Sequence, residues 1–204
     1  LCVTMIPLLT KSHYPEGQKY LADIMTLALP GIDPNDMVKT QLALKAFSVM
    51  FTIVPFIKGN NTEEASGFRN IMEDWCFEFL NRALAVMANQ TTSKDAVIKI
   101  DQVLDVLLKQ TFLPFFCQLS KELYLRCTKK IVEYVLNNFH WDNKKQFAVI
   151  CGFAATAHPE LSVKLFLTPI YNRMKDESVT DDEAKWYAFI LAYVLRKAGA
   201  VSLK

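Results

Sequence analysis

The sequence has few glycines, no excess of either charge and no pattern typical of β-strands. Only 6 of its 204 residues are glycine, whereas 51% are hydrophobic, and this balance favours long helices joined by few loops. Basic and acidic residues number 23 and 21, for a formal net charge of +2. Because no basic stripe stands out, the composition does not indicate a protein that binds nucleic acid directly.

The cysteines are odd in number and lie far apart, and no Cys-x-x-Cys pair indicates a zinc site. Their neighbours are mostly apolar, so we expect buried, free thiols in a reducing compartment. For the same reason we expect no glycan at the sequons of Asn60 and Asn89. The five cysteines are Cys2, Cys76, Cys117, Cys127 and Cys151.

The sequence also lacks the glycine-rich phosphate and dinucleotide loops and the Gly-x-Ser-x-Gly nucleophile motif. Its three histidines, His13, His140 and His158, fall in expected corners, where capping or surface roles account for them. Cys151 and His158 are a candidate nucleophile and base, but they lie about two turns apart on one helix and its end. That separation along the helix is too long for direct contact.

The charged clusters have structural explanations. Asp181-Asp182-Glu183 is a candidate metal site, yet helix capping accounts for all three residues, and Glu63-Glu64 has the same interpretation. A polyanion could bind Lys129-Lys130 together with Lys144-Lys145 only if their helices were adjacent. The preferred interpretation of both pairs is a solvated helix face. We therefore predict no catalytic, cofactor-binding or metal-binding residue, no cofactor, and a protein that is not an enzyme.

The stretch from Ala28 to Lys58 is the most informative part of the chain. Leu29-Pro30-Gly31 should end one helix, with Gly31 in a left-handed conformation. Asp33 is then expected to be the N-cap of the next helix, with Pro34 at its first position and Asp36 in its first turn. Because the corner is so short, the helices on either side should be packed neighbours.

The run from Leu42 to Ile57 has a single charge, Lys45, and bulky apolar side chains in every direction. It is shorter than the roughly 20 residues that span a bilayer, and Lys45, Thr52 and Pro55 interrupt it. We therefore predict a central helix covered by neighbouring helices on most sides, and no membrane span.

Helical spacing and caps divide the rest of the chain. Tyr20, Ile24, Leu27 and Ala28 should form the apolar face of a helix from about Pro15 to Leu29. Further helices are expected at about 62–89 and 93–114, at 120–137 with Ser120 as its start, and at 143–157 with Asp142 as its cap. The next should begin at Pro159, and the last at the capping box Thr180–Glu183, ending with Arg196 and Lys197 in its final turn and Gly199 as its C-cap.

Proline is expected to interrupt several of these helices, because it removes a backbone hydrogen bond and clashes with the preceding turn. Pro55 should kink or end its helix, Pro114 should break or bend its helix, and Pro169 should kink the one that begins at Pro159. The aromatic residues follow helical spacing and are interpreted as core: Phe47, Phe51, Phe77, Phe79, Phe115, Phe116 and Trp186.

About eight helices result, and short corners make successive helices antiparallel. Taken in pairs they recur at roughly 40–45 residues, the period of HEAT-like repeats. Because several helices are apolar on more than one side, we predict an irregular all-α solenoid of antiparallel pairs, occupying residues 1–204 without an internal domain boundary. The apolar residues at both ends suggest a fragment of a longer array.

One motif resembles a known family. Leu29-Pro30-Gly31-Ile32-Asp33-Pro34-Asn35-Asp36, followed by Lys39-Thr40 and the apolar helix from Phe47 to Pro55, is similar to the large HEAT-repeat proteasome activator family, proteasome activator complex subunit four. Looser similarities are spread over nearly the whole chain, although between Thr62 and Ser93 only the helical pattern agrees. They are Tyr14–Gly17, Cys117–Glu122, His158–Phe166 and Asp182–Trp186.

The resemblance implies a dome of helical repeats that caps the proteasome core particle and opens its gate, without ATP, to peptides and unfolded proteins. It further implies a location in the nucleus and cytoplasm, turnover of acetylated histones and a link to DNA repair. The family docks through a hydrophobic-Tyr-x carboxyl terminus, which Ser202-Leu203-Lys204 does not match. We therefore expect this chain to be part of the dome wall, with no acetyl-lysine or inositol-phosphate site assigned to any residue.

Two other classes of protein are considered. An importin- or exportin-type transport receptor is also an irregular HEAT array and is the main alternative. It would copurify with a small GTPase, whereas an activator would copurify with core-particle subunits. An all-helical enzyme is the third possibility, which a catalytic cluster on one concave face would support.

Overall fold

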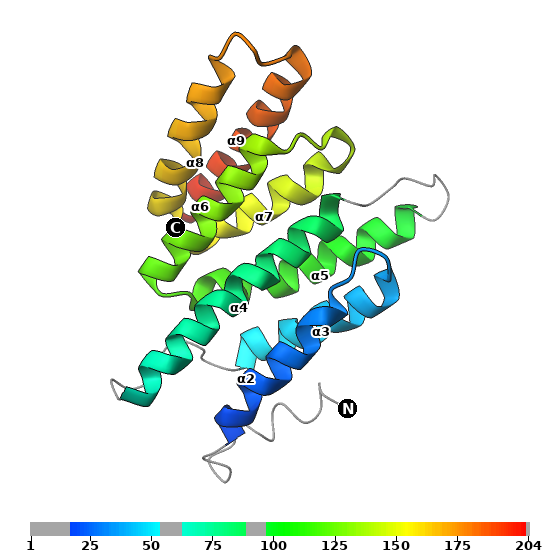
Figure 1. Ribbon diagram of the computed structural model, residues 1–204. Helices are drawn as coiled ribbons and strands as arrows, with labels where there is room; N and C mark the ends of the chain where they lie inside the picture. Colours follow the sequence, from blue (N-terminus) through cyan, green and yellow to red (C-terminus); the bar gives the residue numbers. More distant parts are fainter. Residues whose placement is uncertain (1–16, 54–62, 89–96, 203–204) are drawn as a thin grey trace. The chain divides into compact units, whose positions relative to one another are not determined.

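The computed structural model describes residues 17–53, 63–88 and 97–202 (Figure 1). Within these ranges the chain forms eight α-helices and two short 3-10 helices and contains no β-strand, so the all-α prediction is confirmed. The same described helices include none that is long and apolar enough to cross a membrane. The elements are α2 (Gly17–Ala28), η1 (Leu29–Gly31), α3 (Met37–Ile53), α4 (Glu63–Ala88), α5 (Val97–Gln118), α6 (Lys121–Asn137), η2 (Trp141–Asn143), α7 (Lys144–Ala157), α8 (Pro159–Met174) and α9 (Asp181–Ser202).

The chain divides into two compact units, one ending at Leu119 and the other beginning at Ser120. The first contains α2 to α5 and the second contains α6 to α9. The expected absence of a domain boundary within residues 1–204 stays a prediction.

In the first unit, the corner between α2 and α3 is where expected but is built differently. Leu29 to Gly31 form a 3-10 turn, and no described glycine has a positive φ, so the left-handed conformation predicted for Gly31 is wrong. A β-carbon at Gly31 would lie 2.9 Å from the Cβ of Ala43. Glycine is therefore needed here for close approach to α3 and not for an unusual backbone angle.

The cap of α3 is Asp36 and not Asp33, contrary to the prediction. The Lys39 N–H donates to Asp36 Oδ1 at 2.9 Å, and the Asp36 carbonyl accepts the first helical bond from the Thr40 N–H. Asp33 Oδ1 instead accepts from the Asn35 N–H within the corner. The corner is also closed by Thr40, whose buried hydroxyl accepts from the Asp33 N–H at 2.8 Å and donates to the Asp33 carbonyl at 2.7 Å.

The central helix α3 is buried along most of its length. Phe47, Met50 and Phe51 are at most 1% exposed, which confirms the burial predicted for this apolar run. Leu42, however, is 66% exposed, so one side of the helix is uncovered within this chain. Residues 54–57, with the kink predicted at Pro55, lie outside the described residues.

An aromatic cluster joins α3, α4 and α5. The rings of Phe79 and Phe115 lie 5.1 Å apart, and those of Phe47 and Trp75 lie 5.4 Å apart in an edge-to-face arrangement. Such ring pairs add to the free energy gained by burying apolar area. The cluster contains Phe47, Phe51, Trp75, Phe79, Phe112, Phe115 and Phe116. All members are buried, which confirms the prediction for Phe47, Phe51, Phe79, Phe115 and Phe116, whereas Phe77 is only half-buried.

Helix α5 packs along α3 and does not break at Pro114, so the predicted break is wrong and the alternative, a bend, stays a prediction. It runs through Pro114 to Gln118. Proline removes the bond to the carbonyl four residues earlier, but that residue, Gln110, is exposed to water. Two side chains tie α5 to α3, since Thr111 Oγ1 donates to the Leu44 carbonyl at 3.1 Å and Gln118 Nε2 donates to the Phe51 carbonyl.

The apolar face predicted for the helix before the corner is wrong at Leu27. Leu27 is 80% exposed, whereas Met25 and Leu29 are buried. The spacing of Tyr20, Ile24, Leu27 and Ala28 fits a helix period, but Met25, Leu29 and Ile32 fit it equally well and are the residues that pack.

Helix α4 is predicted correctly, with Trp75, Phe79, Leu80, Ala83 and Met87 buried.

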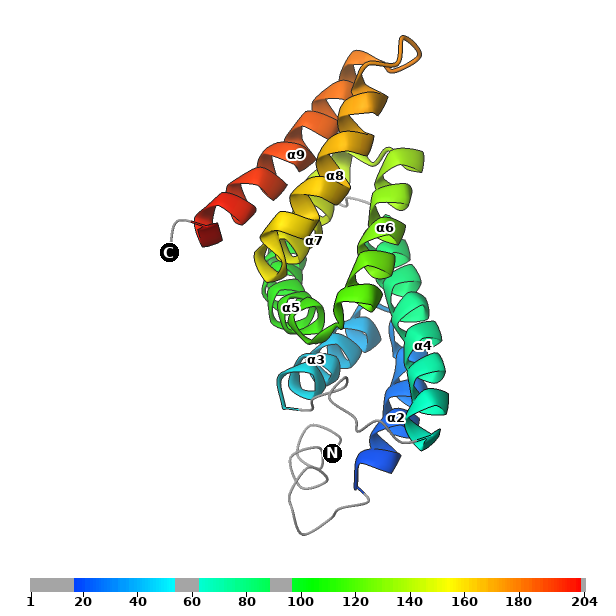
Figure 2. The same cartoon turned by 90° about the vertical axis from the view of Figure 1, so that its left-hand side faces the viewer.

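In the second unit, helices pack against their second neighbours in the chain as well as their first. Helix α7 lies along α9, and α6 lies along α8. Figures 1 and 2 show α8 and α9 side by side and running in opposite directions. Helix α7 is buried without interruption from Gln146 to Ala155. A β-carbon at Gly152 would lie 2.6 Å from the Tyr193 ring, so glycine allows α9 to approach α7 closely.

The caps of the second unit are partly as predicted. Ser120 caps α6, its hydroxyl accepting from the Leu123 N–H at 3.2 Å, and Pro159 occupies the first turn of α8. Asp142 lies inside η2 and is not the cap of α7, whose N-cap position is Asn143. Helix α8 continues through Pro169 to Met174.

The capping box at the start of α9 is confirmed. The Thr180 N–H donates to Glu183 Oε2 at 2.9 Å, and the Glu183 N–H donates to Thr180 Oγ1 at 3.3 Å. The predicted end of the helix is wrong, because α9 continues to Ser202 and includes Gly199. Arg196 and Lys197 therefore lie before the last turn.

Replacing Asp36 by alanine should lower the free energy of unfolding by about 1 kcal/mol, because the Lys39 N–H loses its cap. Asp33→Ala is the matched control and should change it by about 0.5 kcal/mol or less, since its carboxylate serves only an exposed turn. Urea unfolding of the two variants checks this. An equal or larger loss for Asp33→Ala would restore Asp33 as the cap.

Candidate functional site

The most elaborate buried polar arrangement of the described residues joins three helices of the second unit. The Tyr124 hydroxyl of α6 donates to the Ala154 carbonyl of α7 at 3.0 Å and is hydrogen bonded to the Ser162 hydroxyl of α8. Tyr124 and Ser162 are both fully buried. Burial raises the pKa of the Tyr124 phenol, so it stays protonated and able to donate at neutral pH.

The described histidines lie in corners, as predicted. His140 precedes η2, and His158 lies between α7 and α8, its ring 4.4 Å from the ring of Tyr124. Burial lowers the pKa of both imidazoles, so they are neutral at pH 7. Neither makes a side-chain cap: His158 occupies the N-cap position of α8 without a capping bond. His13 lies outside the described residues.

The thiol of Cys151 is poorly suited to act as a nucleophile. It is fully buried, and burial raises its pKa far above neutral, whereas reactive cysteines have lowered pKa values and partial exposure. Cys76 and Cys127 are likewise free and buried, as expected, but Cys117 is exposed, contrary to the prediction. Cys2, Asn60 and Asn89 lie outside the described residues, and the reducing compartment stays a prediction.

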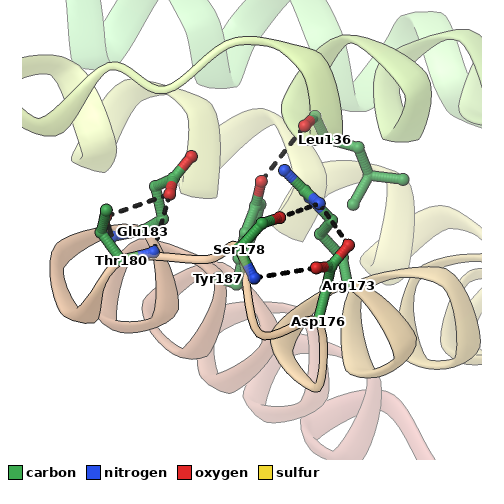
Figure 3. A network of polar contacts seen from close by, with 7 residues as sticks. All are labelled: Leu136, Arg173, Asp176, Ser178, Thr180, Glu183 and Tyr187. Atoms are coloured by element: carbon green, nitrogen blue, oxygen red, sulfur yellow. Dashed lines mark hydrogen bonds and ion pairs between the residues drawn. The ribbon is translucent and has the colours of Figure 1, made fainter.

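The loop between α8 and α9 carries a network of exposed polar contacts (Figure 3). The Arg173 guanidinium donates to Asp176 Oδ2 at 2.7 Å and to the Ser178 hydroxyl at 3.3 Å. The Ser178 N–H donates to Asp176 Oδ1, and this hydrogen bond is the main reason that the pKa of the Asp176 carboxyl is lowered. Tyr187 joins the start of α9 to α6, because its hydroxyl donates to the Leu136 carbonyl at 3.1 Å. These bonds hold the loop in place, and the Arg173 guanidinium is already bound to Asp176 and Ser178.

The acidic run at the start of α9 has the structural role expected of it. Glu183 forms the capping box, and its bond from the Thr180 N–H lowers the pKa of the carboxyl. Asp182 accepts from Lys185 Nζ at 3.0 Å. Among the described residues, no group of three or more His, Cys, Asp or Glu side chains is arranged to hold a metal ion. Lys129 lies 3.9 Å from Glu133 on the exposed face of α6.

An open groove of about 510 Å³ lies between the first half of α8 and the second half of α9. Its lining is mainly apolar, with one carboxylate and one ammonium a single helical turn apart on α8. This is the lining of a contact surface and not a convergent set of reactive groups. The lining residues are Pro159, Glu160, Val163, Lys164, Leu195, Ala198 and Gly199.

Sequence reasoning did not find the Tyr124–Ser162 connection. The partners of the Tyr124 hydroxyl lie 30 and 38 residues away in the chain. No local pattern marks such a pair. The only signal is that a buried tyrosine usually finds a hydrogen-bond partner.

Comparison with known proteins assigns these paired helices to a family. A family model for the mid HEAT-repeat region of proteasome activator complex subunit 4 matches residues 1–75 and 69–185. The chain belongs to this family. The antiparallel helix pairs are accordingly HEAT-type repeats, and the predicted α-solenoid is confirmed.

Relatives in this activator family share about a fifth to a quarter of the residues. The chain is 24% identical over 216 residues to proteasome activator complex subunit 4B of Danio rerio, which covers 92% of the chain. It is 22% identical over 215 residues to subunit 4 of Xenopus laevis and of Homo sapiens, which each cover 91% of it. The chain spans 12% of the length of these relatives. The family is a regulatory one, and the expectation that this chain is not an enzyme stays a prediction.

Replacing Tyr124 by phenylalanine should lower the free energy of unfolding by about 1–3 kcal/mol, because the variant leaves the buried Ser162 hydroxyl without its partner. The Ala154 carbonyl loses one of its two hydrogen bonds and keeps the bond from the His158 N–H. Tyr171→Phe is the matched control, since Tyr171 lies on α8 and is 50% exposed. Its effect should be about 0.5 kcal/mol or less. Chemical unfolding of both variants is the measurement, and equal effects would show that the Tyr124 hydroxyl does not join the three helices.

Proposed function

We propose that this chain forms part of the dome wall of an ATP-independent proteasome activator, which caps the core particle and opens its gate to peptides and unfolded proteins. The observation that carries the proposal is the family match over residues 1–185. The relatives are named as subunits of a proteasome activator complex. The core particle is therefore the expected partner of the protein that contains this chain.

The packing of the helices suits a wall. A wall must keep its shape while it touches a large partner, and layered helices with interdigitated side chains deform little. Helix α7 is buried over ten consecutive residues, and the aromatic cluster fills the space between α3, α4 and α5. In such a protein the chemistry belongs to the core particle, and the activator contributes shape and contact area.

The substrates and the location are extensions of this proposal. Acetylated histones are proposed to be among the substrates, with roles in histone turnover and DNA repair. The nucleus and the cytoplasm are the proposed compartments. We propose no direct contact with nucleic acid and none with a membrane. The near-neutral charge supports the first of these statements.

An importin- or exportin-type transport receptor would also be built from HEAT repeats. No specific observation favours it, and the matched family is a different one. Affinity purification distinguishes the two proteins by their companions, because an activator brings down core-particle subunits and a transport receptor brings down a small GTPase.

The full-length protein that contains this chain should stimulate cleavage of fluorogenic peptides by purified core particle without added nucleotide. The chain alone should not stimulate it, because gate opening requires many repeats held together around the rim of the core particle. An inactive full-length protein would contradict the activator assignment. Stimulation by the chain alone would contradict a passive wall.

The chain alone is also expected to be poorly soluble. Leu27, Val38 and Leu42 of the first unit are 66–80% exposed, and Tyr171 of the second is 50% exposed. Neighbouring repeats normally cover such faces in a solenoid. The peptide-cleavage assay therefore needs light scattering as a check that the chain alone is monodisperse before its lack of activity is interpreted.

A further inference from the structure

Helix α7 is joined to α6 at both of its ends through a histidine ring. At its start, the His140 ring stacks on Phe147 at 5.3 Å with an interplanar angle of 7°, and Tyr134 of α6 lies 6.2 Å from the same imidazole. At its end, the His158 ring meets Tyr124 of α6 at 4.4 Å. The two corners therefore have the same composition, a histidine beside α7 packed on a tyrosine of α6.

The same ring nitrogen is buried in both histidines. The Nε2 atoms of His140 and His158 are inaccessible to solvent and have no hydrogen-bond partner. A neutral imidazole can leave one nitrogen unprotonated, but an imidazolium has a proton on both. Protonation would therefore place a charged N–H donor in a buried position without an acceptor, which is costly. Burial lowers the pKa of both rings accordingly.

The ionisable groups around His158 do not offset this cost. Tyr124 from α6 and Cys151 from α7 have pKa values raised by burial, so both are neutral between pH 5 and 8. Glu160 of α8 is exposed. From α9, Lys197 lies against α7 at Gly152, and its positive charge disfavours a second one nearby.

The surroundings of His140 are similar. Tyr134 of α6 has a pKa raised by burial, and α7 presents the apolar ring of Phe147 to the imidazole. Tyr187 of α9 reaches the end of α6 but donates its hydroxyl to the Leu136 carbonyl. Asp142, two residues further along, is exposed. No described carboxylate is hydrogen bonded to either imidazole.

We propose that α7 is a pH-sensitive element, whose two ends separate from α6 when His140 and His158 become protonated on mild acidification. This proposal goes beyond the proposed function and does not depend on it. The direction of the pH effect follows from proton binding. Because the open state binds the two protons more readily than the closed state, the closed state becomes less stable as the pH falls below the ordinary histidine pKa of about 6.5. The equilibrium constant for opening should rise by up to about tenfold per histidine per pH unit below that value.

Hydrogen–deuterium exchange with mass spectrometry, corrected for the intrinsic pH dependence of exchange, tests the proposal on the full-length protein. Peptides covering 144–157 should lose protection between pH 7.5 and 5.5. The internal control is 37–53, which covers α3 and contains no histidine, and its protection should change much less. Equal changes in the two segments would show general acid destabilisation and overturn the proposal.

The double variant His140→Gln/His158→Gln should retain the protection of 144–157 at pH 5.5, because glutamine does not titrate in this range. His13→Gln, which replaces the third histidine, is the matched control and should respond to pH as the wild type does. A double variant that still opens on acidification would contradict the proposal.

A second measurement needs no substitution and remains decisive if the double variant folds poorly. The slow exchange of the imidazole C2 hydrogen, followed by mass spectrometry against pH in the wild-type protein, gives the pKa of each histidine. Values for His140 and His158 below the ordinary histidine value are expected, and values at or above it would overturn the proposal.

Discussion

The packing of helices against their second neighbours in the chain is the constraint on which both units depend. Helix α3 lies along α5 in the first unit, and α6 lies along α8 and α7 along α9 in the second. A helix in such a layer contacts helices on more than one side, so one apolar stripe is not enough. This explains why α7 is buried over ten consecutive residues and why the residues that allow close approach, Gly31 and Gly152, are glycines.

Local signals predicted the helices well, because a cap or a proline acts within one turn. Ser120, Pro159 and the box formed by Thr180 and Glu183 begin their helices as expected. The errors arose where contacts distant in sequence decide. Asp33 and Asp36 are both good caps by type, and the bonds between Thr40 and Asp33 place the start of α3 after Asp36. Gly199 resembles a C-cap, but α9 continues through it to Ser202.

The polar interactions of the second unit were beyond the reach of sequence reasoning for the same reason. The connection of Tyr124 to Ala154 and Ser162 spans three helices, and nothing in the spacing of these residues marks it. The family, in contrast, was accessible from a short motif, because the corner from Leu29 to Asp36 combines a packed glycine, two turns and a cap in eight residues. A wall segment of the kind proposed would act through contact area, which no local sequence motif marks.

A cryo-electron microscopy structure of the full-length protein bound to the core particle would test the central claim most directly. The account predicts that residues 1–185 form antiparallel helix pairs within the shell above the core-particle end. It also predicts that other repeats cover Leu27, Val38 and Leu42, which are exposed in this chain. A structure in which these residues form a separate body away from the shell, or in which the protein does not bind the core particle, would contradict it.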